Sequence, residues 1–141
     1  MKNYFFAIIF LALFFAGCSA SSDKKEFTPS PVYNYVWVAQ QLANTDLEKV
    51  ANEDKPYLNF DPEKGTYDGF GGCNRLSGTF ELTGNNIKFS PAAATRMACN
   101  SMAVEDNFLK TIEKVNSYKV EGKTLTLYTD GLAVLILNAM Q

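Results

Sequence analysis

Gly71-Gly72-Cys73-Asn74-Arg75-Leu76-Ser77-Gly78-Thr79-Phe80 is the stretch of this 141-residue chain that decides its fold. Glycine adopts backbone angles that other residues avoid, so Gly71, Gly72 and Gly78 predict turns. Asn74 also suits a turn, because asparagine tolerates the left-handed conformation and can hydrogen-bond its own backbone. A binding role for this turn is the alternative to the structural one, and the sequence leaves both open.

Short runs of β-forming residues lie on both sides of this stretch. Residues 32–39 are rich in valine and aromatic side chains and hold the only tryptophan, Trp37. Residues 40–55 are polar and acidic, and fit either a long loop or a short helical turn. Farther along, Leu125 and Leu127 alternate with threonines, as in a strand with one buried face. The predicted strands are residues 32–39, 57–60, 65–70, 77–82, 87–89, 118–121, 124–129 and 132–137.

One helix is predicted between the fifth and sixth of these strands. Its apolar residues recur at steps of three and four and form one stripe: Val104, Phe108, Leu109, Ile112 and Val115. Asn100 or Ser101 can cap its start, and Glu105 and Asp106 stand in the first turn, where the helix dipole favours acidic residues.

These elements predict a mainly β fold of the α+β class. A curved antiparallel sheet forms a small, partly closed barrel packed on one α-helix, in a single domain over residues 32–141. Tyr33, Tyr35, Trp37 and Phe60 stand at strand spacing and are expected in its core rather than in a ligand site.

A second motif, Thr95-Arg96-Met97-Ala98-Cys99, completes a specific pattern. A Gly-Cys-Asn-x-x-x-Gly run followed by Thr-Arg-Met-Ala-Cys, then by Glu105 and Phe108-Leu109, resembles the META domain family, whose members include the heat-shock lipoprotein HslJ. The resemblance covers about residues 35–138. It implies a small, mainly β, partly closed barrel with one helix, found in stress, surface and virulence contexts rather than tied to one reaction.

Cys73 and Cys99 are expected to form a disulfide, because paired cysteines in an oxidising envelope usually do. A redox-active or lipid-accepting thiol is the alternative, but no Cys-x-x-Cys spacing favours a low thiol pKa.

Arg96 lies in a run of small and apolar residues, which suggests a buried guanidinium paired with Glu105. The alternative is a binding residue that holds a carboxylate or phosphate. The candidate partner-binding residues at the two motifs are Asn74, Arg75, Thr95 and Arg96.

The start of the chain resembles a lipoprotein signal peptide. Lys2 precedes an apolar run of twelve residues, 5–16, which is shorter than the roughly 20 that span a bilayer. Phe15-Ala16-Gly17-Cys18 resembles a bacterial lipobox, in which cleavage leaves the cysteine first with a diacylglycerol on its sulfur. We therefore expect a signal peptide over residues 1–17, lipid attachment at Cys18 and a flexible tether over residues 18–31. An ordinary secreted protein with a free Cys18 is the alternative.

Composition narrows the function. Without residues 1–17 the net charge is -3, so nothing favours binding to nucleic acid. The chain has no histidine, which excludes Ser-His-Asp triads, Cys-His pairs and His-ligated zinc sites. Asp61, Glu63 and Asp68 lack the spacing of a Ca²⁺ loop and predict a solvated acidic face. No metal or cofactor is expected.

The sequence thus predicts a non-catalytic, monomeric envelope lipoprotein that interacts with or stabilises another envelope component under stress. Binding of a small molecule in the barrel mouth and modulation of an envelope protease are the alternatives. Ser19 after the anchoring cysteine indicates the outer membrane under the enterobacterial sorting rule.

Overall fold

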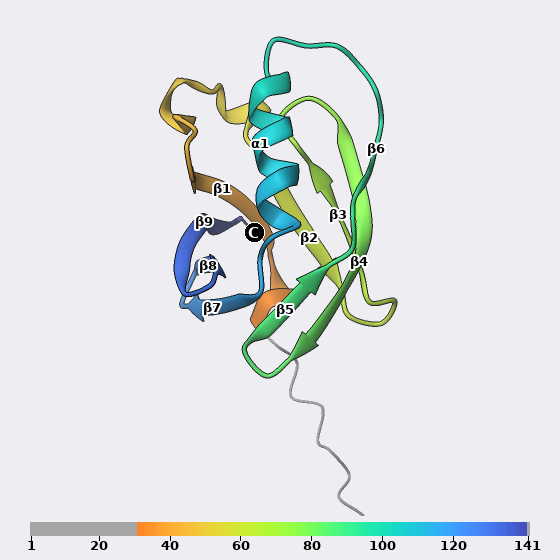
Figure 1. Ribbon diagram of the computed structural model, residues 1–141, viewed down its shortest axis with the longest axis vertical. Helices are drawn as coiled ribbons and strands as arrows, with labels where there is room; N and C mark the ends of the chain where they lie inside the picture. The colour runs from red at the N-terminus through yellow and green to blue at the C-terminus, as the bar shows by residue number, and fades with distance from the viewer. Residues whose placement is uncertain (1–30, 141) are drawn as a thin grey trace, which may run out of the picture.

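Nine antiparallel strands and one α-helix make up residues 31–140, the part of the chain that the computed structural model describes (Figure 1). The predicted signal peptide, Cys18 and nearly all of the predicted tether lie outside these residues. The elements in chain order are β1 (Val36–Leu42), β2 (Tyr57–Asp61), β3 (Thr66–Phe70), β4 (Arg75–Thr83), β5 (Asn86–Phe89), β6 (Ala93–Ala94), α1 (Met102–Ile112), β7 (Ser117–Glu121), β8 (Thr124–Thr129) and β9 (Leu132–Met140). Three short 3-10 turns are η1 (Pro31–Asn34), η2 (Leu47–Lys49) and η3 (Asn52–Asp54).

Eight of the described strands close into a ring. The order β1-β2-β3-β4-β5-β7-β8-β9 returns to β1 through the β1–β9 pairing. β4 pairs with β3 through its first half and with β5 through its second half, and β6 pairs with the start of β4 on the β5 side. The prediction of a mainly β barrel with one helix is confirmed, and the ring of pairings is complete.

The ring is joined most narrowly between β5 and β7. Only Asn86 and Ser117 are register partners there. Two backbone bonds beside this pair, from Ile87 N to the Asn116 oxygen (3.2 Å) and from Tyr118 N to the Asn85 oxygen (2.9 Å), complete the joint.

The barrel interior is filled by apolar side chains, because alternate residues of each strand point inward. Trp37 is fully buried, and its indole Nε1 donates a 2.7 Å hydrogen bond to the carbonyl oxygen of Val32. The core also contains Leu42, Leu58, Phe60, Tyr67, Phe80, Ile87, Phe89, Phe108, Ile112, Leu125, Leu127, Leu135 and Leu137. The barrel is therefore a packed core.

The helix follows the predicted stripe. Phe108 and Ile112 are fully buried, and Val104 and Leu109 pack partly against the core. Ser101 stands at the N-cap, but its side chain makes no capping hydrogen bond, so only the position of the predicted cap is confirmed. Among residues 31–140, no helix has the length and hydropathy needed to cross a membrane.

The start of the domain differs from the prediction. Residues 31–34 form the 3-10 turn η1, and the first strand runs from Val36 to Leu42 instead of over residues 32–39. Proline at the first position suits such a turn because its φ is already fixed. Two short 3-10 turns occupy the segment that the sequence left undecided, and Asp46 caps the first by accepting from Glu48 N. Trp37 and Phe60 are buried as expected, whereas Tyr33 and Tyr35 are only partly buried.

Gly78 has a different role from the one predicted. It lies inside β4, not in a turn, and a Cβ atom there would come within 2.6 Å of the Tyr67 hydroxyl oxygen. Glycine at this position lets the Tyr67 ring lie flat against the strand, where its hydroxyl donates to the Ser90 carbonyl oxygen (3.0 Å).

Candidate functional site

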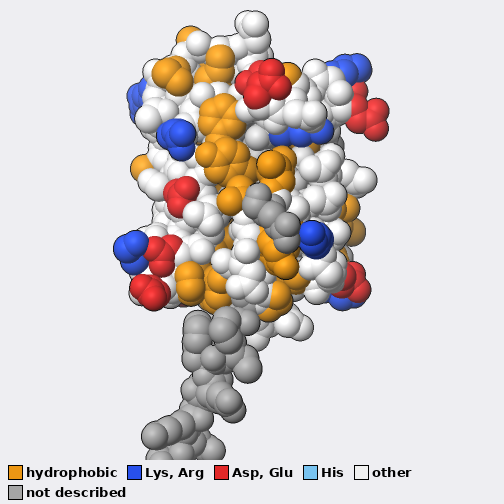
Figure 2. Space-filling model, turned by 180° about the vertical axis from the view of Figure 1, so that it is seen from behind, with side chains coloured by type: hydrophobic (Ala, Val, Ile, Leu, Met, Phe, Trp, Pro, Cys, Tyr) orange, Lys and Arg blue, Asp and Glu red, His pale blue; other side chains and the backbone are white. Residues whose placement is uncertain are grey.

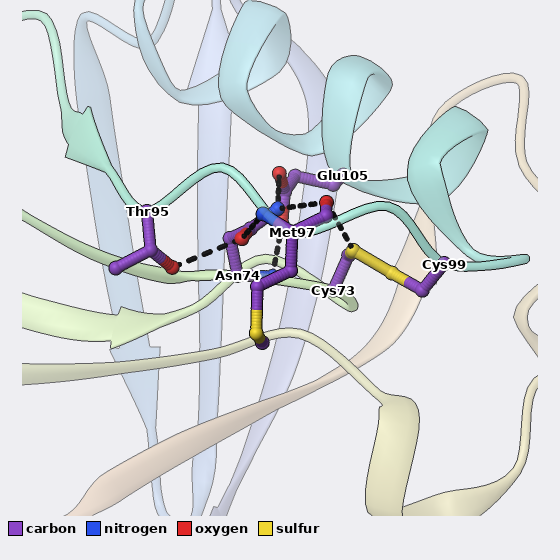
Figure 3. Close-up of a disulfide and its surroundings, with 6 residues drawn as sticks. All are labelled: Cys73, Asn74, Thr95, Met97, Cys99 and Glu105. Carbon is purple, nitrogen blue, oxygen red and sulfur yellow. Dashed lines mark hydrogen bonds between the residues drawn. A yellow bond between two sulfur atoms is a disulfide. The ribbon is translucent and has the colours of Figure 1, made fainter.

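The two sequence motifs lie side by side around a disulfide (Figure 3). Cys73 and Cys99 form the expected disulfide, with Cα atoms 6.0 Å apart across 26 positions of sequence. Close beside it, the Thr95 N–H donates to the Arg75 carbonyl oxygen (3.1 Å), which extends the β4–β6 ladder by one bond. The segment 95–99 is thus fixed at both ends to residues 73–75. We call this arrangement, residues 71–75 with 95–99, the motif crossing.

Asn74 is the centre of the motif crossing. Its side chain is 2% exposed and forms both bonds of a clamp on Met97: Oδ1 accepts from Met97 N (2.7 Å) and Nδ2 donates to the Met97 oxygen (3.2 Å). Oδ1 also accepts from the Thr95 hydroxyl (2.9 Å). The side-chain amide of Asn74 therefore makes the hydrogen bonds that a neighbouring β-strand would make to the backbone of Met97.

Glu105 supplies the second half of this network from the first turn of α1. Its carboxylate accepts from Asn74 N (2.5 Å) and from Asn74 Nδ2 (2.8 Å), and its side chain is buried. Among the described residues, no buried side-chain oxygen or nitrogen lacks a hydrogen-bond partner. Full pairing of this kind is what allows a carboxylate to be buried at tolerable cost.

The glycines beside Asn74 make room for this carboxylate. A Cβ atom at Gly71 would lie 2.7 Å from Cγ of Glu105, so any larger residue would displace the acid. Gly72 has a φ of +112°, which strains residues with a side chain. Gly72 is the turn glycine that the sequence predicted, whereas Gly71 is required by close packing.

Arg96 does not form the expected buried ion pair. Its side chain is exposed, and the carboxylate of Glu105 is taken by Asn74. The ion pairs of residues 31–140 are Lys49–Asp46, Lys64–Asp61 and Lys119–Glu121, all at the surface. The prediction that Arg96 is buried and paired with Glu105 is therefore wrong, because segment 95–99 lies on the outside of the barrel.

The other candidate binding residues differ in accessibility. Asn74 is buried within the network, whereas Arg75 at the start of β4 and Thr95 directly after β6 are exposed. Met97, which the sequence analysis did not single out, is 63% exposed although its backbone is clamped on both sides. An exposed apolar side chain on a fixed backbone indicates a binding residue, and the sequence alone does not show either property of Met97.

A groove of about 510 Å³ opens beside the disulfide. It is lined by Glu53, Tyr57, Phe70, Cys73, Arg75, Thr95 and Met97. The rings of Tyr57 and Phe70 stack in it, with centroids 6.1 Å apart and planes inclined by 27°. Seen from behind, the molecule carries a band of hydrophobic side chains flanked by charged ones (Figure 2).

The acidic residues near β2 and β3 are arranged as the sequence predicted. Asp61 accepts from the backbone of Glu63 and Lys64 and from Lys64 Nζ (2.6 Å), and this pairing with Lys64 lowers the pKa of the Asp61 carboxyl. Asp68 accepts from Asn59 Nδ2 (3.3 Å). Within residues 31–140, no three His, Cys, Asp or Glu side chains gather as a metal site would require.

The family is shown by comparison with known sequences. The META domain model matches residues 30–141, which is most of the chain. The protein belongs to the META domain family. A search among curated proteins finds no significant match.

Solved structures share the META fold of this chain. An NMR structure of a protein from Burkholderia xenovorans is 19% identical, covers 78% of this chain and 84% of its own, and superposes with a TM-score of 0.62. A crystal structure of a DUF4847 family protein from Bacteroides vulgatus is 12% identical, covers 79% of this chain and 95% of its own, and has a TM-score of 0.58. At these identities the likeness shows the fold alone.

Proposed function

We propose that this META domain is a non-catalytic interaction module of a bacterial envelope, anchored by a lipid on Cys18, that binds a partner protein through the motif crossing. The proposal rests on Met97, whose side chain is exposed while its backbone is held in place. A buried asparagine, a buried carboxylate and a disulfide together hold an exposed segment whose apolar side chain faces solvent. A rigid loop with an exposed apolar anchor loses little conformational entropy when it binds, and this favours a recognition surface.

Few features of this surface support catalysis. The side chains that line the groove include one carboxylate, one guanidinium and two hydroxyl groups, and no histidine exists in the chain to activate a nucleophile. The disulfide occupies both cysteines of the domain. These features support binding rather than turnover.

The test places a photo-crosslinking amino acid at position 97 of the full chain in its own membrane. The matched control places it at Leu132, which is 72% exposed on β9. We expect an adduct with one protein from position 97 and none from position 132. Equal adducts from both positions, or none from either, would contradict the proposal.

The anchor is tested separately. Growth with a clickable fatty acid should label the wild-type protein and leave Cys18→Ser unlabelled and released from the membrane fraction. Label on both proteins would show that the lipid is elsewhere.

A small-molecule binder is the second candidate. The packed core offers no room inside the barrel, but the 510 Å³ outer groove falls in the size range of ligand pockets. Native mass spectrometry of protein purified from cells would favour this candidate if a ligand mass is lost on unfolding.

A further inference from the structure

One row of outward side chains crosses β1, β2, β3 and β4, and its members on β2, β3 and β4 form the floor of the groove. Val38 is the register partner of Tyr57, Tyr57 of Phe70, and Phe70 of Arg75. Neighbouring strands lie about 4.8 Å apart, so the row from Tyr57 to Arg75 spans roughly 10 Å. It therefore presents an apolar surface that ends at a guanidinium.

The next row along the same strands is polar, although it faces the same way. It consists of Asn59, Asp68 and Ser77, which are register partners in turn. The outer face of β2, β3 and β4 therefore folds with polar side chains in one row, so folding alone does not explain the apolar side chains of the other. Tyr57 and Phe70 of the apolar row line the groove together with Met97 and Cys73 of the disulfide.

The charged side chains of the groove indicate which class of ligand it binds. The guanidinium of Arg75 is exposed in the groove and belongs to none of the ion pairs of residues 31–140. Arg75 and Arg96 are the only arginines of the chain, and Arg96 lines a neighbouring hollow that shares Thr95 and Met97 with the groove. A guanidinium binds a carboxylate through two parallel hydrogen bonds. Glu53 also lines the groove and repels a ligand with several negative charges, which argues against phosphate and anionic lipid headgroups.

We infer that this groove binds an extended peptide segment of a protein partner, with one apolar side chain on Tyr57 and Phe70 and an adjacent carboxylate on Arg75. The inference rests on the proposed function and names the chemistry of its partner. In this complex the thioether of Met97, at the side of the groove, packs against the apolar side chain of the peptide, because the flexible methionine side chain adapts to varied shapes.

Methyl NMR on the full chain gives a direct test, because the chain has four methionines and Met97 alone lines the groove. The probes are four pools of random hexapeptides whose two central residues are Phe-Asp, Phe-Asn, Phe-Lys or Ser-Asp. We expect a saturable shift of the Met97 methyl signal with Phe-Asp, and at least tenfold weaker binding for the Phe-Lys and Ser-Asp pools.

Charge reversal supplies the matched controls. Arg75→Glu should reverse the order, so that Phe-Lys binds better than Phe-Asp, while Lys88→Glu, at an exposed position of β5 outside the groove, should leave the order unchanged. Both residues are exposed, so both variants should keep the melting temperature of the wild type. This pair of variants separates recognition of charge from any change in the fold.

Three outcomes overturn the inference: no saturable shift with any pool, equal binding of the Phe-Asp and Phe-Lys pools, or a shift of Met97 only with phosphatidylglycerol vesicles. If any of these occurs while position 97 still crosslinks to one protein, the partner chemistry is wrong and the proposed function stands. If the crosslink is also absent, both fail.

Discussion

The barrel core and the motif crossing are held by opposite means. In the core, apolar side chains such as Trp37, Leu58 and Leu125 are completely buried, and their burial is not directional. At the motif crossing, one asparagine and one carboxylate make directional bonds, and the side chains that they position face outward. Apolar burial therefore maintains the barrel, whereas the polar network fixes one short segment on its surface.

Removal of the Trp37 side chain should have the largest effect. Trp37→Ala empties the centre of the core and should lower the free energy of unfolding by about 3–5 kcal/mol. This is a large fraction of the roughly 5–15 kcal/mol of a typical domain, so denaturant unfolding would detect it. Val36→Ala on the same strand, at an outward position, is the control and should cost less than about 1 kcal/mol. Similar losses for both variants would contradict the packed core.

Loss of the disulfide comes next. A bridge across 26 positions stabilises by about 3.5 kcal/mol in the chain-entropy model. The Cys73→Ser, Cys99→Ser double variant should lose about this much free energy of unfolding, and wild type in reductant should match it. Amide exchange at Met97 should also accelerate more than at Leu127 in β8, because the bridge fixes the segment directly. Equal acceleration at the two amides would remove the distinction between the two regions.

Asn74→Ala should cost about 2–4 kcal/mol, because it leaves the buried carboxylate of Glu105 and the backbone of Met97 short of partners. Asn59→Ala removes a single 3.3 Å bond at the surface and should cost less than about 0.5 kcal/mol. If Asn74→Ala unfolds with the wild-type midpoint, water replaces the network and the clamp on Met97 is not needed for stability.

The sequence predicted most of the strands because their residues alternate, and it predicted the disulfide because only two cysteines remain besides Cys18. It did not predict β6, since the small residues of 91–95 show no alternation and pair only because β4 lies beside them. It placed Arg96 inside because small apolar neighbours usually indicate burial. The partners of Asn74 are 21 to 31 positions away, so only the folded chain reveals the network.

The smallest effect concerns pH and one polar group inside the apolar core. Burial, with a lesser contribution from the charge of Glu113, raises the pKa of Tyr67 to about 12. The folded chain therefore keeps this phenol proton between about pH 10 and 12, where the unfolded chain releases it. The stability that Tyr67 contributes is complete below about pH 10 and is lost as the pH rises through 12. After allowance for solvent near the hydroxyl, this amounts to about 1–2 kcal/mol.

Tyr67→Phe separates this contribution from those of the other ionisable groups. The variant loses the hydrogen bond to the Ser90 oxygen, so at pH 7 it should be less stable than wild type by about 1 kcal/mol. Its free energy of unfolding should fall less steeply than that of wild type between pH 10 and 12, so the two curves should converge. Urea unfolding at pH 7, 9, 10 and 11 measures both curves. Parallel curves would mean that the phenol already reaches solvent in the folded state. Convergence would show that the interior of the barrel excludes water even at its polar group, in contrast to the motif crossing, whose polar network holds an exposed segment.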